Sequence, residues 1–274
     1  MCRVLQVSRS SYYAWLVRPE SNRSLERTLF EKRIEQVYHK SKKRYGSPKI
    51  AMELKMQGHL ISRPRVARIM RSLGLRSIIH KKYRVTTTHS NHSESISPNV
   101  LRRNFTVLQA GKVWVSDITY IKVKRGWMYL TIIMDLYDRK IIGWSISNGM
   151  SCEETVQKAW GMALINRKPQ EGLIFHSDRG IQYTSSLFRS SLRKVNATQS
   201  MSRKGDCWDN AIAENFFKIL KSECVNHQTF SSSLCTKREL FYFIEAWYNR
   251  QRIHSYLGYQ TPNDFGKLKM NTAA

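Results

Sequence analysis

The sequence has few acidic residues and no long apolar run. Only 20 Asp and Glu stand against 46 Lys and Arg, so the 274-residue chain has a formal net charge of +26. Nowhere do about 18 apolar residues follow one another, which excludes a transmembrane helix. The first residues also lack the apolar stretch of a signal peptide. We therefore expect neither an integral membrane protein nor a secreted one.

Cysteine is also scarce and irregularly placed. The cysteines are odd in number, and no two have the C-x-x-C spacing. None pairs with histidines at zinc-finger spacing, so the sequence offers no zinc framework. Free thiols in a reducing cytosol fit this pattern best, so we expect a cytoplasmic protein. The five cysteines are Cys2, Cys152, Cys207, Cys224 and Cys235.

Basic charge is concentrated in the first part of the chain. Residues 1–104 carry 23 Lys and Arg against 6 Asp and Glu, whereas the remaining 170 residues carry 23 against 14. This asymmetry predicts a polyanion-binding region attached to a second module. A membrane surface is the alternative partner, but it calls for a basic amphipathic helix with bulky apolar anchors. Nucleic acid is therefore the better prediction.

Residues 44–80 have the pattern of two helices joined by a turn. Ser47 can cap the first helix, with a proline following it. Ser62 can cap the second helix, and Gly74 can end it. The apolar stripe of the second helix consists of Val66, Ile69, Met70 and Leu73. The arginines off this stripe are Arg63, Arg65, Arg68 and Arg71.

A helix-turn-helix places its second helix in the major groove of DNA, where arginine binds guanine edges or phosphates. We therefore predict that these four arginines contact DNA. The alternative is a solvated basic face on a small helical bundle. Residues 1–43 are predicted to be helical, and residues 2–15 look like the second half of another helix-turn-helix whose first helix lies upstream. Residues 81–104 are basic and lack apolar periodicity, which predicts a linker.

The rest of the chain, residues 105–268, alternates predicted strands and helices. Three strands come first and form an antiparallel meander. Helices and two more short strands then alternate, which is the order of an α/β RNase H-like fold with a five-stranded mixed sheet. The predicted strands are 113–123, 127–136, 140–146, 173–176 and 195–199. The predicted helices run from 151 to about 165, from 184 onward and from 209 onward.

Three acidic residues occupy distinctive positions in this pattern. Asp117 lies in the middle of an apolar strand, Asp178 follows a buried strand, and Glu214 lies on a helix. Convergent carboxylates repel one another and are stable around hard cations. Two Mg²⁺ ions about 4 Å apart can serve an in-line phosphoryl displacement. The alternative for any one of these acids is a helix cap or a surface charge.

The sequence resembles the transposases of bacterial insertion sequences that have a retroviral-integrase-like catalytic core. The resemblance is to the second-frame protein of the insertion-sequence-three family, and it extends over nearly the whole chain. It rests on the strings WVSDITY (114–120), HSDRGIQY (176–183), DNAIAENFFKILK (209–221) and YNRQRIHSYLGYQTP (248–262). As in that family, 35 residues separate the second acid from the third, and a basic residue, Lys221, follows the glutamate by seven positions.

The resemblance implies a catalytic triad of Asp117, Asp178 and Glu214 that also binds two metal ions, Mg²⁺ or Mn²⁺. Asp117 is expected to bridge both ions. The implied reaction has no covalent enzyme intermediate: water frees a 3′-OH at the end of the element, and that hydroxyl attacks another phosphodiester. Lys221 is expected to hold DNA phosphate. His176 and Asn210 are candidates for supporting the metal ligands, contacting DNA or serving the structure, and Arg252 and His254 for contacting DNA or bracing the core.

The implied partners are double-stranded DNA at the element ends and the target, further copies of the chain, and an upstream-frame helix-turn-helix protein or a fusion with it. No membrane partner is expected. The implied location is the bacterial cytoplasm, at the nucleoid when the protein is bound to DNA. Two alternatives remain open. One is a non-catalytic or domesticated remnant that binds DNA, and the other is a nuclease for RNA–DNA hybrids.

Overall fold

A computed structural model describes residues 2–79, 96–124 and 126–271, and the chain divides into two units, Met1–His80 and Lys81–Ala274. Most of the predicted linker, namely residues 81–95, lies outside the described residues. None of the described helices is long and apolar enough to cross a membrane.

The first unit is helical. Three of its helices supply the core. The long helix contributes Phe30, Ile34, Val37 and Tyr38, and the next one contributes Ile50 and Leu54. The last helix contributes its apolar stripe. Because the long helix packs against both others, the boundary predicted at residue 44 lies inside one packed unit. The helices are α1 (Arg9–Leu16), α2 (Asn22–Lys40), α3 (Ser47–Met56) and α4 (Arg63–Ser72).

The predicted second helix is confirmed in detail. The hydroxyl of Ser62 accepts the backbone N–H of Arg65, which satisfies one of the unpaired donors at the start of α4. Beyond the helix, Gly74 has φ +68°, a backbone conformation that glycine adopts without strain. The predicted cap of the first helix was wrong by one position. Gly46 caps α3, without a side-chain bond, and Ser47 is the first helical residue.

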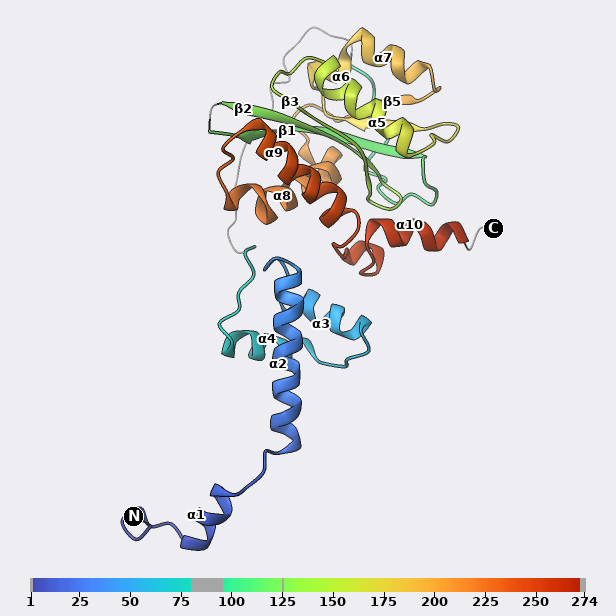
Figure 1. Ribbon diagram of the computed structural model, residues 1–274. Helices are drawn as coiled ribbons and strands as arrows, with labels where there is room; N and C mark the ends of the chain where they lie inside the picture. Colours follow the sequence, from blue (N-terminus) through green and yellow to red (C-terminus); the bar gives the residue numbers. More distant parts are fainter. Residues whose placement is uncertain (1, 80–95, 125, 272–274) are drawn as a thin grey trace. The chain divides into compact units, whose positions relative to one another are not determined.

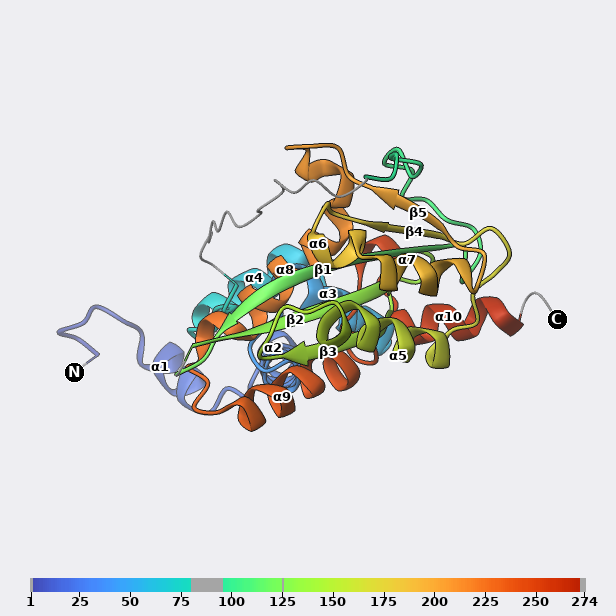
Figure 2. The same cartoon turned by 90° about the horizontal axis from the view of Figure 1, so that it is seen from above.

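The second unit is built on a five-stranded sheet with the order β3-β2-β1-β4-β5, visible in Figure 2. The first three strands form the predicted antiparallel meander, and β1 pairs with β4 and β4 with β5 in parallel. The mixed α/β sheet is therefore as predicted. The strands are β1 (Val113–Lys122), β2 (Trp127–Asp135), β3 (Ile141–Ser147), β4 (Ile174–Ser177) and β5 (Thr198–Met201).

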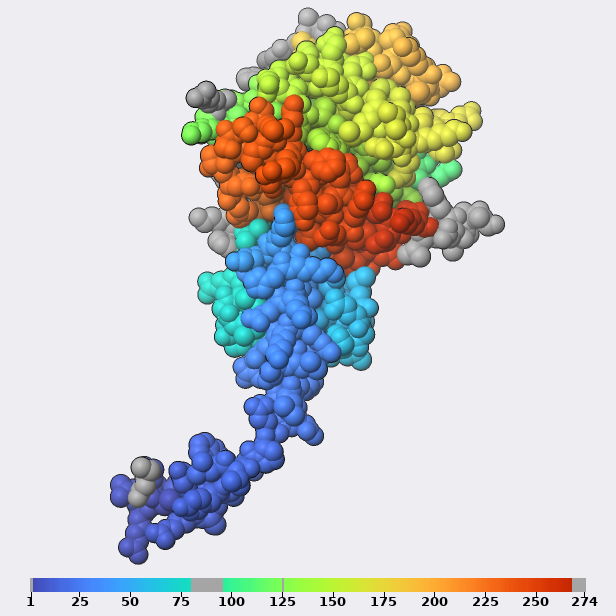
Figure 3. All heavy atoms as spheres, viewed as in Figure 1, coloured from blue at the N-terminus to red at the C-terminus, as the bar shows by residue number. Residues whose placement is uncertain are grey.

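The helices of this unit cover both faces of the sheet. In Figure 1, α5, α6 and α7 lie on one face, and α8 and α9 lie on the other. The orange and red C-terminal segments form a continuous part of the surface in Figure 3. The α-helices are α5 (Lys158–Asn166), α6 (Ile181–Thr184), α7 (Ser186–Arg193), α8 (Ala211–Glu223), α9 (Ser233–Phe241) and α10 (Pro262–Asn271). A π-helical turn, Glu153–Gln157, precedes α5, and another, Tyr242–Tyr248, follows α9.

The core on the α5 face is rich in aromatic rings. Trp114, Trp160, Phe175 and Phe188 are all buried, and four of their ring pairs lie edge to face at 5.0–5.8 Å. Trp114 and Phe175 belong to the paired strands β1 and β4 and point to this face. Since side chains alternate along a strand, the next residues, Val115 and His176, point to the α8 face.

The last strand begins three residues later than predicted. Residues 195–197 instead close the end of α7, because the N–H of Ala197 bonds back to the carbonyl of Leu192 at 3.0 Å. Asn196 has φ +53°, a left-handed conformation that breaks an extended strand. The pairing of β5 with β4 then starts at Thr198.

Residues 97–104, which fall in the predicted linker, belong to the second unit and pack against its edge strand β5. The hydroxyl of Ser200 on β5 accepts the backbone N–H groups of Val100 and Leu101 at 2.9 and 3.1 Å. Leu101 is buried. The hydroxyl of Ser97 donates to Gln199 at 3.0 Å. We call residues 97–104 the arm, since they precede β1 and are fixed along the edge strand.

Candidate active site

The pairing of β1 with β4 brings Asp117 and Asp178 together. The last paired residues are Val115 and His176, and the two aspartates follow them by two positions in each chain segment. Parallel neighbouring strands lie about 4.8 Å apart, and residues two positions apart share a face. Both carboxylates therefore belong to the α8 face, at the end where β4 stops.

Glu214 lies in the first turn of α8, the helix that packs on β1. The apolar side of this helix is buried through Ala213, Phe216, Phe217 and Leu220, which leaves Glu214 on the exposed side. Burial and the charge of Asp178 both raise the pKa of the Glu214 carboxyl. The third acid is thus within electrostatic reach of the second.

The Asp117 carboxyl has a strongly perturbed pKa. Burial is the main cause that raises its pKa well above the ordinary value, and the charges of Asp178 and Glu214 raise it further. A backbone hydrogen bond from Ile118 at 2.8 Å and the charge of Lys221 act in the opposite direction. The structure therefore brings the three predicted acids and Lys221 into one interacting group.

The donor set of this group fits a hard divalent cation. All three side chains are carboxylates, and their mutual repulsion marks a place short of positive charge. Within the described part of the chain, no three His, Cys, Asp or Glu side chains already lie together as a metal site. Asp117 and Asp178 each accept a nearby backbone N–H instead, from Ile118 and Gly180.

Lys221 follows Glu214 by seven residues, or about two helical turns, and so lies on the same side of α8. Partial burial lowers the pKa of its amine, and the charge of Asp117 raises it. The ammonium group is thus oriented along the same side as the acids, where a phosphate could bind.

A buried polar layer lies next to Asp117. The hydroxyl of Ser116 donates to the carbonyl of Ile132 at 2.8 Å and pairs with the hydroxyl of Tyr183, also at 2.8 Å. Because the Ser116 proton is already used, Tyr183 is the donor of that second bond. Asn210 donates its amide to the Ser116 carbonyl at 3.0 Å. Asn210 is therefore buried support for β1 at the residue before the first acid.

His176 is fully buried in the α8 face of β4. Its Nδ1 lies 2.8 Å from the hydroxyl of Ser200, and its Nε2 lies 3.2 Å from that of Ser202. Burial lowers the pKa of His176 to about 4, so the ring is neutral near pH 7. Of the roles considered for His176, the structure supports bracing of β4 against β5.

Arg252 and His254 are also buried. The guanidinium of Arg252 donates to Glu223 at the end of α8, with its Nη2 2.9 Å from Oε1. Trp247 donates to the other oxygen of Glu223 at 2.9 Å. His254 packs edge to face against Tyr248, with centroids 4.8 Å apart. Both residues of the C-terminal motif therefore brace the core in this structure.

The four arginines of α4 do not share one environment. Arg63, Arg68 and Arg71 are exposed, and they lie within an arc of about 140° on a helix of 3.6 residues per turn. Arg65 is partly buried at the border of the apolar stripe. It forms an ion pair with Glu26 at 2.9 Å and stacks over Phe30 at 5.0 Å. Arg65 thus joins α4 to α2, whereas the other three face solvent.

Several residues of the site were missed in the sequence. Tyr183 stands inside the HSDRGIQY string, and its place two residues into a short helix gave no sign of its hydrogen bond to β1. Asp209 and Glu223 bind arginines that are distant in sequence. Their positions at the two ends of α8 are the only local signal that could have indicated a structural role.

The fold and the site define a class of protein in which a helical unit is followed in sequence by an integrase-type core. Two models, each described as an integrase core domain, match residues 108–207 and 195–262. A model described as an HTH-like domain matches residues 24–83. These matches cover both units.

Full-length relatives identify the family. The transposase for insertion sequence element IS904 of Lactococcus lactis is 40% identical over 252 residues, covering 91% of this chain and 98% of the relative. The transposase InsF for insertion sequence IS3A of Escherichia coli is 38% identical over 269 residues, covering 97% and 92%. The chain belongs to the family of IS3-type transposases.

Solved structures are similar to part of the chain at low sequence identity. The integrase catalytic core domain of HTLV-2, in complex with magnesium, has a TM-score of 0.41 and 17% identity and covers 57% of this chain and 95% of that one. The catalytic domain of Mos1 mariner transposase has a TM-score of 0.43 and 16% identity, with coverage of 50% and 71%.

Proposed function

We propose that this transposase cuts and joins DNA at the ends of its insertion sequence by metal-dependent hydrolysis and strand transfer. Asp117, Asp178 and Glu214 are the catalytic residues of this proposal. Its main support is the strand pairing that joins Asp117 and Asp178, together with the position of Glu214 on α8, where its charge interacts with theirs.

The three carboxylates would hold two Mg²⁺ ions, for which Mn²⁺ can substitute. Bound there, such ions activate the attacking oxygen and stabilise the leaving oxygen of an in-line displacement. Asp117 supplies the central carboxylate, with Asp178 and Glu214 beside it. Lys221 binds a phosphate oxygen on the same side of α8 and so holds the DNA strand against the acids.

The first unit supplies DNA binding in this proposal. Arg63, Arg68 and Arg71 form its exposed basic face, and a helix of this kind can enter the major groove. Arg65 is assigned to the packing of α4 on α2 instead. The partner is double-stranded DNA of the element ends and of the target.

We also propose that the active species is an oligomer, because both ends of the element must be held in one protein–DNA complex. The apolar side chains around α1, including Val4, Tyr13 and Trp15, are exposed, and none of the α1 residues is buried. They offer a docking surface for the upstream-frame helix-turn-helix protein or for the rest of a fusion with it. Comparing the binding of element-end DNA by this chain alone and by the fusion tests that partner.

Strand transfer tests the chemistry directly. A labelled duplex carrying the element ends is incubated with a target plasmid, the full-length chain and Mg²⁺ or Mn²⁺. We expect joined products with the wild type and none with Asp117→Asn. The control is Asp138→Asn. Asp138 is a buried aspartate outside the proposed catalytic triad, and it pairs with Arg167. Joining that persists in excess EDTA or in Asp117→Asn refutes the proposal.

Two other functions give different results in the same assay. A non-catalytic DNA-binding remnant binds the duplex but yields no joined product under any metal condition. A nuclease for RNA–DNA hybrids cleaves a hybrid duplex in preference to DNA of the same sequence.

A further inference from the structure

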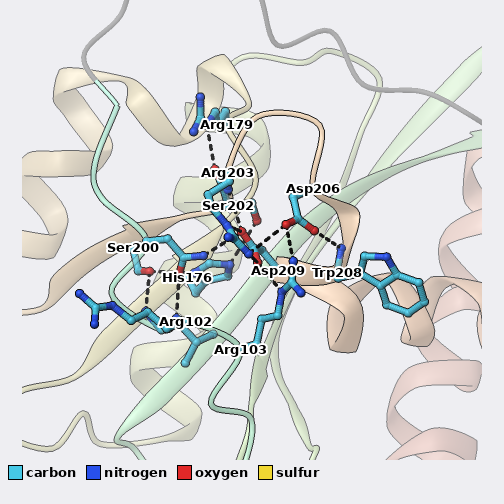
Figure 4. Close-up of polar contacts among 12 residues, drawn as sticks. Arg102, Arg103, His176, Arg179, Ser200, Ser202, Arg203, Asp206, Trp208 and Asp209 are labelled. Carbon is cyan, nitrogen blue, oxygen red and sulfur yellow. Dashed lines mark hydrogen bonds and ion pairs between the residues drawn. The ribbon is translucent and has the colours of Figure 1, made fainter.

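Asp209 is a buried carboxylate with an unusually complete set of donors. Its side chain is 0% exposed and accepts five hydrogen bonds of 2.7–3.0 Å. Oδ1 accepts from Arg103 and Arg203, and Oδ2 accepts from Asn99 and from the backbone and side chain of Arg203. Figure 4 shows the two arginines converging on this one residue.

The donors come from two separate parts of the chain. Asn99 and Arg103 belong to the arm, more than 100 positions earlier in sequence. Arg203 belongs to the loop that leaves β5. Asp206 in the same loop also pairs with both arginines. Asp209 therefore fastens the arm and the loop to each other at a single point.

Asp209 also lies directly before the start of α8, the helix that carries Glu214. Asp209 belongs to a short 3₁₀ helix, Cys207–Asn210, and α8 begins at the next residue, Ala211. Asn210 binds the carbonyl of Ser116, the residue before Asp117. Two consecutive side chains thus join the start of α8 to the arm and to β1, only one turn before the third acid.

We propose that Asp209 is a positioning residue that fixes the start of α8 so that Glu214 can meet Asp117 and Asp178 around a metal ion. The inference rests on the proposed function, since it concerns the same acids. Asp209 itself points to the arginines and acts only through the short connection to α8. Arg103 has the same positioning role, because it links the arm to this connection through Asp209.

Metal binding measured without turnover tests the proposal. Free Mn²⁺ is measured by electron paramagnetic resonance during titration of the full-length wild type and of the variants Asp209→Asn, Arg103→Gln and Glu214→Gln. Residues that hold metal ligands in place typically change metal affinity by about 10- to 100-fold. We expect about tenfold weaker Mn²⁺ binding in Asp209→Asn and a smaller loss in Arg103→Gln, where Arg203 still binds Asp209.

A matched control separates positioning from general destabilisation. Asp138→Asn removes another buried carboxylate, 2.6 Å from its partner Arg167, and is expected to keep the wild-type Mn²⁺ affinity. Raising the Mn²⁺ concentration should restore strand transfer in Asp209→Asn, because the ligands remain present. The double variant Asp209→Asn with Arg103→Gln should bind Mn²⁺ no more weakly than Asp209→Asn alone.

The outcomes distinguish this inference from the proposed function. If wild type and Glu214→Gln bind Mn²⁺ equally, the metal site itself is wrong. If Glu214→Gln loses the ion while Asp209→Asn and Arg103→Gln keep wild-type affinity, the acids bind metal and the positioning role is refuted. If circular dichroism shows that Asp209→Asn does not fold, Arg103→Gln decides: weaker Mn²⁺ binding at an unchanged melting temperature supports the proposal, and unchanged binding overturns it.

Discussion

Replacing Arg252 by alanine is expected to destabilise the second unit without weakening DNA binding. The guanidinium donates to Glu223 through Nε and Nη2, and the two side chains are only 9% and 1% exposed. Removing the arginine leaves a buried carboxylate without its counter-charge, which costs about 3–5 kcal/mol. In a unit of this size, each kcal/mol lowers the melting temperature by about 2–4 °C. The expected decrease is therefore about 6–20 °C.

Calorimetry of the full-length chain measures this loss in the transition of the second unit, and fluorescence anisotropy measures DNA affinity at a temperature where the variant is folded. The double variant Glu223→Gln with Arg252→Met serves as the control. Its amide still accepts from Trp247, and no charge remains buried, so part of the stability should return. An Arg252→Ala chain that melts like the wild type but binds DNA more weakly would refute the assignment of this residue to the core.

Three further predictions concern the acids, the basic face and a buried aspartate. Glu214→Gln should abolish strand transfer while DNA affinity, measured by anisotropy, stays equal or rises slightly, because one negative charge facing phosphate is removed. Arg68→Ala should lower the slope of log affinity against log salt by about one unit, whereas Arg65→Ala should mainly lower the melting temperature. Burial raises the pKa of Asp135 to about 6, so the folded state binds its proton more tightly than the unfolded chain. Stability should then fall by about 2 kcal/mol as pH rises from 4 to 7, and Asp135→Asn should lack this decrease in urea titrations.

Each of these predictions has an outcome that contradicts it. Parallel loss of DNA affinity and activity in Glu214→Gln would give that residue a structural role. Equal changes of the salt slope in both arginine variants would place Arg65 on the DNA-binding face. A pH profile that Asp135→Asn leaves unchanged would show that another group is responsible.

The parts of the site that depend on local pattern could be predicted from sequence. The strand and helix patterns around Asp117, Asp178 and Glu214 marked these acids as candidates, and the structure brings their charges together. Helical periodicity and the Ser62 cap located α4. In each case, the physical signal lies within a few residues of the position concerned.

The contacts between distant segments could not be predicted in the same way. Nothing around Asp209 indicates that its partners stand at Asn99 and Arg103. Arg65 borders the apolar stripe of α4, but its partners Glu26 and Phe30 belong to another helix. The three-residue shift of β5 likewise depends on how α7 ends, which strand propensity alone does not encode.

The helix that carries Glu214 is secured at both ends by buried carboxylates, Asp209 just before it and Glu223 in its last turn. Their partners lie in the arm, in the loop after β5 and in the C-terminal motif. Fraying of the start of this helix would break its contacts with the arm and the loop, and fraying of its end would break those with the C-terminal motif. Its amide protons should exchange with solvent only when the whole unit opens. Heat should then inactivate the transposase in step with global melting, and not through earlier local unfolding of the helix that carries Glu214.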